Sequence, residues 1–224
     1  MGLRAVIFDC DGVLADTEPL HFRVFNRVLE ALGITITPTE YATEYLGLAD
    51  REAFSRALTL HDLDLSREQI ERLVIAKARA FTTVLSAECR IYPGVVPFVR
   101  SLDGLSRAVA SGARREEIEI VLRHAALAGA FTVIIGAEDV AAGKPDPTPF
   151  RTALAGLNRT GTSIAPEDCL VVEDSTIGLV AARPAGMRCL AVTNSYPAAK
   201  LASADLVVSS LEEVSLADVF RLFG

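Results

Sequence analysis

The chain has 224 residues, of which 50% are apolar and 23% charged, a balance typical of a globular protein with a sizeable core. Its formal net charge is −7 and its basic residues are scattered, so we expect neither a nucleic-acid partner nor attachment to a membrane. The longest stretch without a formal charge, residues 124–137, is shorter than the ~18 residues of a membrane-spanning helix. We therefore expect a cytoplasmic protein that is a monomer or a weak homo-oligomer.

Short apolar runs predict buried β-strands along most of the chain. Their continuous hydrophobicity is typical of strands that are covered on both faces. Helix-like stretches separate most of the runs, and this alternation predicts an α/β fold with a Rossmann-like, doubly wound parallel sheet. The predicted strands are residues 5–8, 108–110, 133–135, 169–172, 189–192 and 205–208.

After the first predicted strand, the sequence shows helical periodicity in place of the alternation of strands and helices. Residues 19–32 carry apolar side chains at helical spacing, and Gly33 follows as a predicted C-terminal cap. Residues 66–85 predict a long helix in which Ser66 and Gln69 form a capping box.

The chain is therefore expected to form two domains. Residues 15–87 contain no strand-like run and predict an all-helical insertion, the cap. Residues 1–14 and 88–224 predict the Rossmann-like core, to which the Tyr-Pro-Gly turn at residues 92–94 returns the chain.

Polar residues follow the first four predicted strands. In an open parallel sheet, ligands bind outside the carboxyl ends of the strands. Taken singly, an acidic residue there is more often a solvated or helix-capping group. Together they place several carboxylates, a hydroxyl and an ammonium on one edge: Asp9 and Asp11, then Ser111 and Gly112, then Lys144, then Glu173 and Asp174.

Converging carboxylates predict a divalent cation between them, because like charges repel and Mg²⁺ binds carboxylate and phosphate oxygens. Lys144 and Ser111 beside these acids predict an anionic ligand, and phosphate is the anion that Mg²⁺ and lysine bind together. With Mg²⁺, Lys144 and a phosphate dianion in place, an excess of about two negative charges remains. This excess predicts further cations from the helical insertion or a proton on one carboxyl group.

The same residues resemble a known family. Residues 9–18 (DCDGVLADTE), the Ser-Gly pair at 111–112, Gly-Lys-Pro at 143–145 and Glu-Asp-Ser at 173–175 closely resemble the four motifs of the haloacid dehalogenase superfamily. The insertion resembles the four-helix cap of the subgroup that contains beta-phosphoglucomutase and many sugar-phosphate phosphatases. The resemblance implies a Mg²⁺-dependent phosphatase of small phosphorylated metabolites, with sugar phosphates favoured.

The resemblance also implies a role for each residue at the edge. Asp9 is the nucleophile that forms an aspartyl-phosphate, and Asp11 is the general acid and base, with its backbone carbonyl on Mg²⁺. The related dehalogenases lack this second aspartate, so Asp11 favours phosphoryl transfer. Glu173 and Asp174 complete the metal site with Asp9 and Asp11, while Ser111, Gly112 and Lys144 bind phosphate oxygens.

Residues of the insertion are expected to contact the substrate, again by resemblance to beta-phosphoglucomutase. The alternative to substrate contact is a purely structural role: His21 as a core histidine, and Arg51 and Lys77 as solvated charges. In the functional interpretation these three supply the missing positive charge. The expected contacts in the insertion are Thr17, His21, Gly47, Arg51 and Lys77.

The segment after Ser111 separates a phosphatase from a mutase. The mutase motif continues with Ala-Ser-Lys-Asn, whereas this chain continues with Gly-Ala-Arg-Arg at residues 112–115. Arg115, with Arg114, either binds a distal phosphate or simply opens the next helix. We expect a phosphatase, with a beta-phosphoglucomutase-type isomerase as the alternative. A phosphometabolite-binding regulator without turnover is disfavoured, because the catalytic set is intact.

Overall fold

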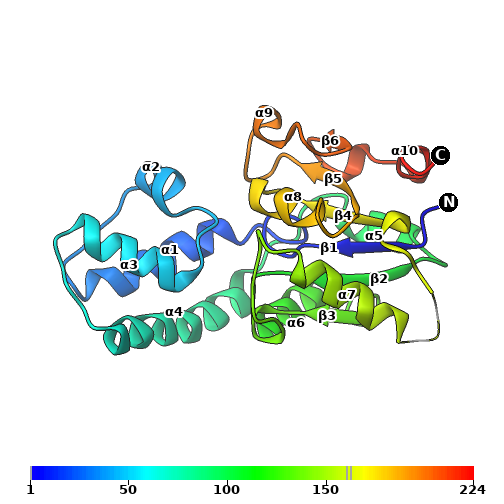
Figure 1. The fold of residues 1–224 in the computed structure, drawn as a ribbon. Helices are drawn as coiled ribbons and strands as arrows, with labels where there is room; N and C mark the ends of the chain where they lie inside the picture. Colours follow the sequence, from blue (N-terminus) through cyan, green and yellow to red (C-terminus); the bar gives the residue numbers. More distant parts are fainter. Residues whose placement is uncertain (1, 160, 162) are drawn as a thin grey trace. The chain divides into compact units, whose positions relative to one another are not determined.

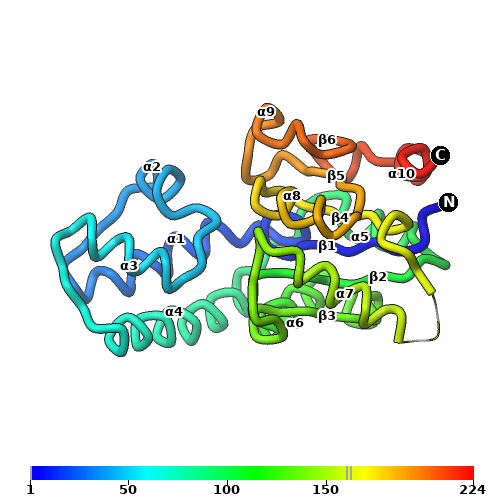
Figure 2. The backbone as a smooth tube through the Cα atoms, viewed as in Figure 1, coloured from blue at the N-terminus to red at the C-terminus, as the bar shows by residue number. Residues whose placement is uncertain are grey.

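The computed structural model describes residues 2–159, 161 and 163–224. The chain divides into two compact units, Met1–Asp16 with Cys89–Gly224, and Thr17–Glu88. We call them the sheet unit and the helical unit. Figure 2 traces the backbone, which leaves the sheet unit once and returns to it once.

The described part of the sheet unit contains a six-stranded sheet in the order β3-β2-β1-β4-β5-β6 (Figure 1). Every neighbouring pair in this order is parallel. The chain starts in the middle of the sheet, winds to one edge at β3, and then winds to the other edge at β6. This confirms the predicted doubly wound sheet. The strands are β1 Ala5–Phe8, β2 Ser106–Ala110, β3 Val133–Ile135, β4 Cys169–Glu173, β5 Arg188–Val192 and β6 Leu206–Val208.

Helices cover both faces of this sheet, which is why its strands are mostly apolar. Ile7 and Val171 share one core with Phe150 of α7 and Leu179 of α8. The neighbouring Phe8 points to the opposite face and contacts the Phe98 ring of α5, with ring centroids 6.1 Å apart. The α-helices are α5 Val95–Ser101, α6 Arg115–His124, α7 Thr148–Asn158, α8 Thr176–Ala182, α9 Ala198–Leu201 and α10 Leu216–Arg221, and the short 3-10 turns are η2 Ala137–Asp139, η3 Pro166–Asp168 and η4 Leu211–Glu213.

The helical unit is built around a small aromatic core. Phe25, Tyr45 and Phe54 are almost fully buried in it. The predicted capping box is present: the Ser66 N–H donates to the Gln69 side chain at 2.8 Å, and the Gln69 N–H donates back to the Ser66 hydroxyl at 3.3 Å. The first helix ends earlier than predicted, with Ala31 and not Gly33 as its C-terminal cap. The elements are α1 Glu18–Glu30, α2 Pro38–Glu40, the π-helix η1 Tyr41–Tyr45, α3 Asp50–Leu60 and α4 Arg67–Glu88.

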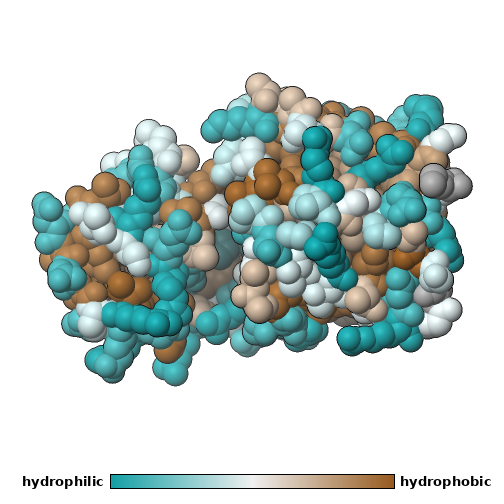
Figure 3. Space-filling view, viewed as in Figure 1, coloured by the Kyte–Doolittle hydropathy of each residue, from teal (hydrophilic) through white to brown (hydrophobic). Residues whose placement is uncertain are grey.

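Polar residues are distributed through the longer helices and over the surface. The 22-residue helix α4 carries charged side chains along its length. Figure 3 shows hydrophilic and apolar residues intermixed over the face that it draws. Among the helices of the described residues, none combines the length and the hydropathy needed to cross a membrane.

Candidate active site

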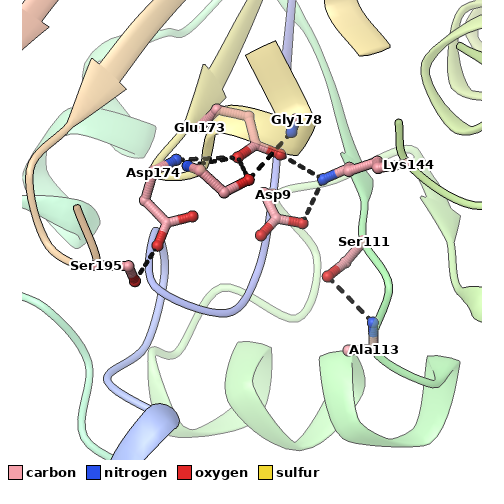
Figure 4. A network of polar contacts seen from close by, with 9 residues as sticks. Asp9, Ser111, Ala113, Lys144, Glu173, Asp174, Gly178 and Ser195 are labelled. Carbon is pink, nitrogen blue, oxygen red and sulfur yellow. Dashed lines mark hydrogen bonds and ion pairs between the residues drawn. The ribbon is translucent and has the colours of Figure 1, made fainter. Parts of the chain in front are cut away.

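The strand register brings the polar residues at the carboxyl ends of β1 and β4 to the same level. Phe8 lies opposite Val172 in the parallel pair, and the Asp9 N–H donates to the Val172 carbonyl at 2.9 Å. Asp9 and Glu173 therefore emerge side by side at the carboxyl edge of the sheet. Ser111, which follows the neighbouring strand β2, lies at the same edge (Figure 4).

A buried ammonium group joins these two carboxylates. Lys144 Nζ donates to Asp9 Oδ1 at 2.7 Å and to Glu173 Oε1 at 2.6 Å. It also lies 4.9 Å from the centre of the Phe150 ring. The loop after β3, which carries Lys144, is thus tied to the ends of β1 and β4 by one cation.

Burial and neighbouring charges set the ionisation of this group. The pKa of Asp9 is raised to about 7. Burial is the main cause, Glu173 and Asp11 add to it, and Lys144 acts in the opposite direction. Burial by itself lowers the pKa of Lys144, but the Asp9 and Glu173 carboxylates outweigh burial and hold that pKa above its usual value. Lys144 is therefore a permanent ammonium, and a further cation beside Asp9 would favour the Asp9 carboxylate.

The second oxygen of Glu173 is held by the start of α8. Glu173 Oε2 accepts hydrogen bonds from the Asp174 N–H at 3.0 Å, the Ser175 N–H at 3.1 Å and the Ser175 hydroxyl at 2.8 Å. Gly178 makes room for this carboxylate, because a Cβ atom at that position would lie 1.9 Å from the Glu173 carboxyl carbon. Both Glu173 oxygens are therefore fixed in direction.

Asp174 is held from another side, by the loop after β5. The Ser195 hydroxyl donates to Asp174 Oδ2, and the Asn194 side-chain amide donates to the Gly12 carbonyl at 2.7 Å. Burial raises the pKa of Asp174, and Glu173 and Asp9 raise it further. Three buried carboxylates thus repel one another at this edge.

The donor set fits a hard divalent cation. Asp9, Glu173 and Asp174 each offer a carboxylate oxygen, and these oxygens lie within 4.8 Å of one another. All three residues are buried. Oxygen ligands of this kind suit Mg²⁺, whose charge would offset the repulsion that raises the pKa of Asp9 and of Asp174.

The other residues expected at this edge are placed less tightly. Asp11 is partly exposed and close enough to raise the pKa of Asp9. Ser111 is 3% exposed, and its hydroxyl accepts the Ala113 N–H at 3.3 Å. Gly112 is exposed, with open space where a Cβ atom would lie, so its backbone is accessible.

The helical unit contains a second polar cluster. Lys77, only 4% exposed, donates to the Asp50 carboxylate and lies 3.0 Å from His21 Nδ1. The His21 ring stacks on Phe81 with centroids 3.9 Å apart. Burial, and then Lys77, hold the pKa of His21 well below its usual value. This lowered pKa favours the neutral imidazole over the cation that the sequence expectation assigns to His21.

Of the remaining expected contacts of the helical unit, Arg51 and Thr17 have partners within that unit. Arg51 forms an ion pair with Glu71 at 2.5 Å and is half exposed. The carbonyl of the buried Thr17 accepts the His21 N–H at 2.9 Å, at the start of α1. Gly47 has a φ of 79°, in the left-handed region that glycine favours.

Arg115 is engaged within the sheet unit. Its guanidinium pairs with Asp139 at 2.7 Å and donates to the Ile134 carbonyl at 2.7 Å. It opens α6, as one of the two sequence interpretations expects. Nothing in these contacts brings it to the carboxylates of the sheet edge.

Asn194 and Ser195 were not among the expected site residues. Both follow β5, and the same rule that identified the residues after the first four strands, applied once more, points to them. Asp50 was also missed, because a carboxylate at the start of a helix reads as an ordinary first-turn acid.

Comparison with known proteins agrees with this geometry. Residues 6–192 match the family model of haloacid dehalogenase-like hydrolases. A phosphorylated carbohydrates phosphatase of Thermotoga maritima is 34% identical over 189 residues, covering 83% of this chain and 82% of the relative. Beta-phosphoglucomutase of Bacillus subtilis is 27% identical over 218 residues, covering 96% and 92%.

A solved structure has the same fold as this chain. The CbbY protein of Rhodobacter sphaeroides, in complex with xylulose-(1,5)bisphosphate, superposes with a TM-score of 0.85 at 30% identity. The match covers 96% of this chain and 98% of CbbY. The family match covers the residues from β1 to β5, so it includes Asp9, Lys144 and the Glu173–Asp174 pair. The chain therefore belongs to the haloacid dehalogenase-like hydrolases.

Proposed function

We propose that this protein is a Mg²⁺-dependent phosphatase of small phosphorylated metabolites, with sugar phosphates as the substrate class. The observation that carries the proposal is the convergence of Asp9, Glu173 and Asp174 around Lys144 at the carboxyl edge of the sheet. The class of substrate follows from the relatives, one named as a phosphatase of phosphorylated carbohydrates and one solved with a sugar bisphosphate.

Asp9 is the proposed nucleophile. A carboxylate needs no separate base, but it must be ionised and must approach an anionic phosphate. The Lys144 ammonium already donates to Asp9 and serves both needs. Mg²⁺, held by Asp9, Glu173, Asp174 and the backbone carbonyl of Asp11, would neutralise phosphoryl oxygens when bound.

The steps around the nucleophile fall to its neighbours. Asp11 would protonate the leaving alkoxide and then take a proton from the water that cleaves the aspartyl-phosphate. The Ser111 hydroxyl and the Gly112 N–H would hold phosphate oxygens. The Lys144 ammonium would also contact the phosphoryl oxygens and offset their negative charge in both steps.

Residues of the helical unit are proposed substrate contacts. Lys77 and His21 form one polar pair of this set, because the Lys77 ammonium can only donate to His21 Nδ1, which lies 3.0 Å away. Arg51, Thr17 and Gly47 complete this proposed set. Arg115 would join it only if a substrate phosphate displaced Asp139 from its side chain.

A second candidate is phosphoryl-transfer isomerisation, which the likeness to beta-phosphoglucomutase favours. The chain differs from that enzyme's motif after Ser111, where it carries Gly-Ala-Arg-Arg. A hydroxyl and an amide that would bind a second phosphate are absent from the sequence there. This difference favours net hydrolysis.

The experiment is a panel of sugar phosphates and other small phosphate monoesters, with inorganic phosphate measured over time. We expect Mg²⁺-dependent release that EDTA abolishes and excess Mg²⁺ restores. In the Asp9→Asn variant we expect a folded protein without turnover, and in the exposed Asp103→Asn control we expect normal turnover.

Two outcomes would contradict the proposal. Isomerisation that needs a bisphosphate primer and releases no net phosphate would identify a mutase. Phosphate release by Asp9→Asn at the normal rate would remove Asp9 from its proposed role.

A further inference from the structure

The two oxygens of Asp174 face different neighbours. Ser195 donates to Oδ2, and Figure 4 shows the other oxygen directed toward Asp9. The residue is 4% exposed, so little water reaches the carboxylate. The hydroxyl of Ser195 thus determines which oxygen faces the proposed metal position.

The loop after Asp9 confines this arrangement. Gly12 has a φ of 75°, and a Cβ atom there would lie 1.9 Å from Asp174 Oδ2 and 2.8 Å from Ser195 Oγ. Asn194, next to Ser195, holds the Gly12 carbonyl at 2.7 Å. The carboxylate therefore lies between two loops that are bonded to each other, and turning it would break its hydrogen bond to Ser195.

Glu173 is restricted in the same way. Its Oε2 is committed to two backbone N–H groups and one hydroxyl. Its other oxygen, Oε1, accepts from Lys144 at 2.6 Å. In Asp174 the Ser195 hydroxyl engages Oδ2, so Asp174 is suited to bind a cation through its other oxygen.

One-oxygen binding distinguishes between cations. Mg²⁺ requires a near-octahedral shell at short distances, whereas Ca²⁺ takes more ligands and often binds both oxygens of a carboxylate. We propose that Ser195 is a metal-selectivity residue: by holding Asp174 Oδ2, it keeps Asp174 a one-oxygen ligand and favours Mg²⁺ over Ca²⁺. This inference rests on the proposed function, because it assumes the Mg²⁺ site.

The test measures binding of Mg²⁺ and of Ca²⁺ to the full-length chain by calorimetry, without substrate. In Ser195→Ala we expect the ratio of the two affinities to move toward Ca²⁺ by about tenfold, the lower end of the effect of removing a partner of a metal ligand. The exposed Ser203→Ala variant is the control and should keep the normal ratio.

A matched pair separates the hydroxyl from packing. Ser195→Thr keeps the hydroxyl and should keep the normal ratio of affinities. Ser195→Val has the shape of the threonine variant but no hydroxyl, so it should behave like Ser195→Ala. This pair also provides the result if Ser195→Ala does not fold.

The possible failures are distinguishable. If the unaltered chain binds no Mg²⁺, the proposed metal site itself is wrong. If it binds Mg²⁺ but Ser195→Ala and Ser195→Val leave the ratio of affinities unchanged, the site stands and the role of Ser195 is overturned.

Discussion

Lys144 is the residue on which the charge balance of the sheet edge depends. Its side chain is 8% exposed and pairs with the carboxylates of Asp9 and Glu173, which are 10% and 0% exposed. In Lys144→Met these carboxylates lose their counter-charge, and breaking a buried pair in this way costs about 3–5 kcal/mol. We expect a decrease of that size in the free energy of unfolding, measured by urea denaturation without divalent cations.

The exposed Lys200→Met variant is the control for this experiment. It also removes one positive charge from the sheet unit, but it breaks no buried pair. Equal losses in the two variants would show that net charge, and not the Lys144 pairing, sets the stability.

The same residue shows what the sequence can reveal about a site. Lys144 is found because it belongs to a short motif after a strand, and Asp9 is found in the same way. The Ser195 hydrogen bond to Asp174 spans 21 positions and depends on how the loop after β5 folds back. No local pattern encodes that contact. The Lys77–Asp50 pair is hidden for the same reason, since its partners lie on separate helices.

The secondary-structure elements differ in how well their sequence predicts them. Strands β1 and β3 coincide with the predicted apolar runs, because their residues are apolar from end to end. Strand β2 begins two residues earlier than predicted, at Ser106 and Arg107, which pair with β1 through the backbone despite polar side chains. The helix start at Ser66 was predictable from its local capping chemistry, whereas α1 ends at Glu30 and Gly33 lies in the turn that follows, with a φ of 75°.

The packing of α1 on α4 leads to a pH-dependent stability. His21 of α1 stacks on Phe81 of α4 and has a lowered pKa because it is buried and close to Lys77. As the pH falls below the ordinary histidine pKa of ~6.5, the unfolded chain binds a proton that the folded His21 does not. Acid therefore favours unfolding through this residue.

We expect the chain to lose about 1 kcal/mol of stability through His21 between pH 6.5 and 5.5, where linkage gives at most ~1.4 kcal/mol for one proton. In His21→Gln this part of the loss should be absent, whereas the exposed His124→Gln control should keep it. Urea denaturation at both pH values measures the difference. Parallel pH profiles for His21→Gln and the unaltered chain would contradict the assignment.

At the scale of the whole molecule, the chain combines a unit that holds the carboxylate cluster with a unit that holds none of its three members. A cation that binds only the folded site stabilises it by mass action, by about 2.7 kcal/mol at 100 times the dissociation constant. We expect Mg²⁺ at that level to slow amide hydrogen exchange in β1 and β4 by about 100-fold, the equivalent of that free energy. Amides of α3 in the helical unit should exchange at an unchanged rate.

Peptide-resolved hydrogen exchange, with and without Mg²⁺, measures both units in one sample. In Asp174→Asn the slowing in β1 and β4 should be much smaller, because one of the three ligands loses its charge. Equal slowing in α3 and in β1 would mean that the two units unfold as one cooperative block. Unequal slowing would mean that the helical unit opens independently of the metal-bound sheet, because the cation stabilises only the unit whose carboxylates bind it.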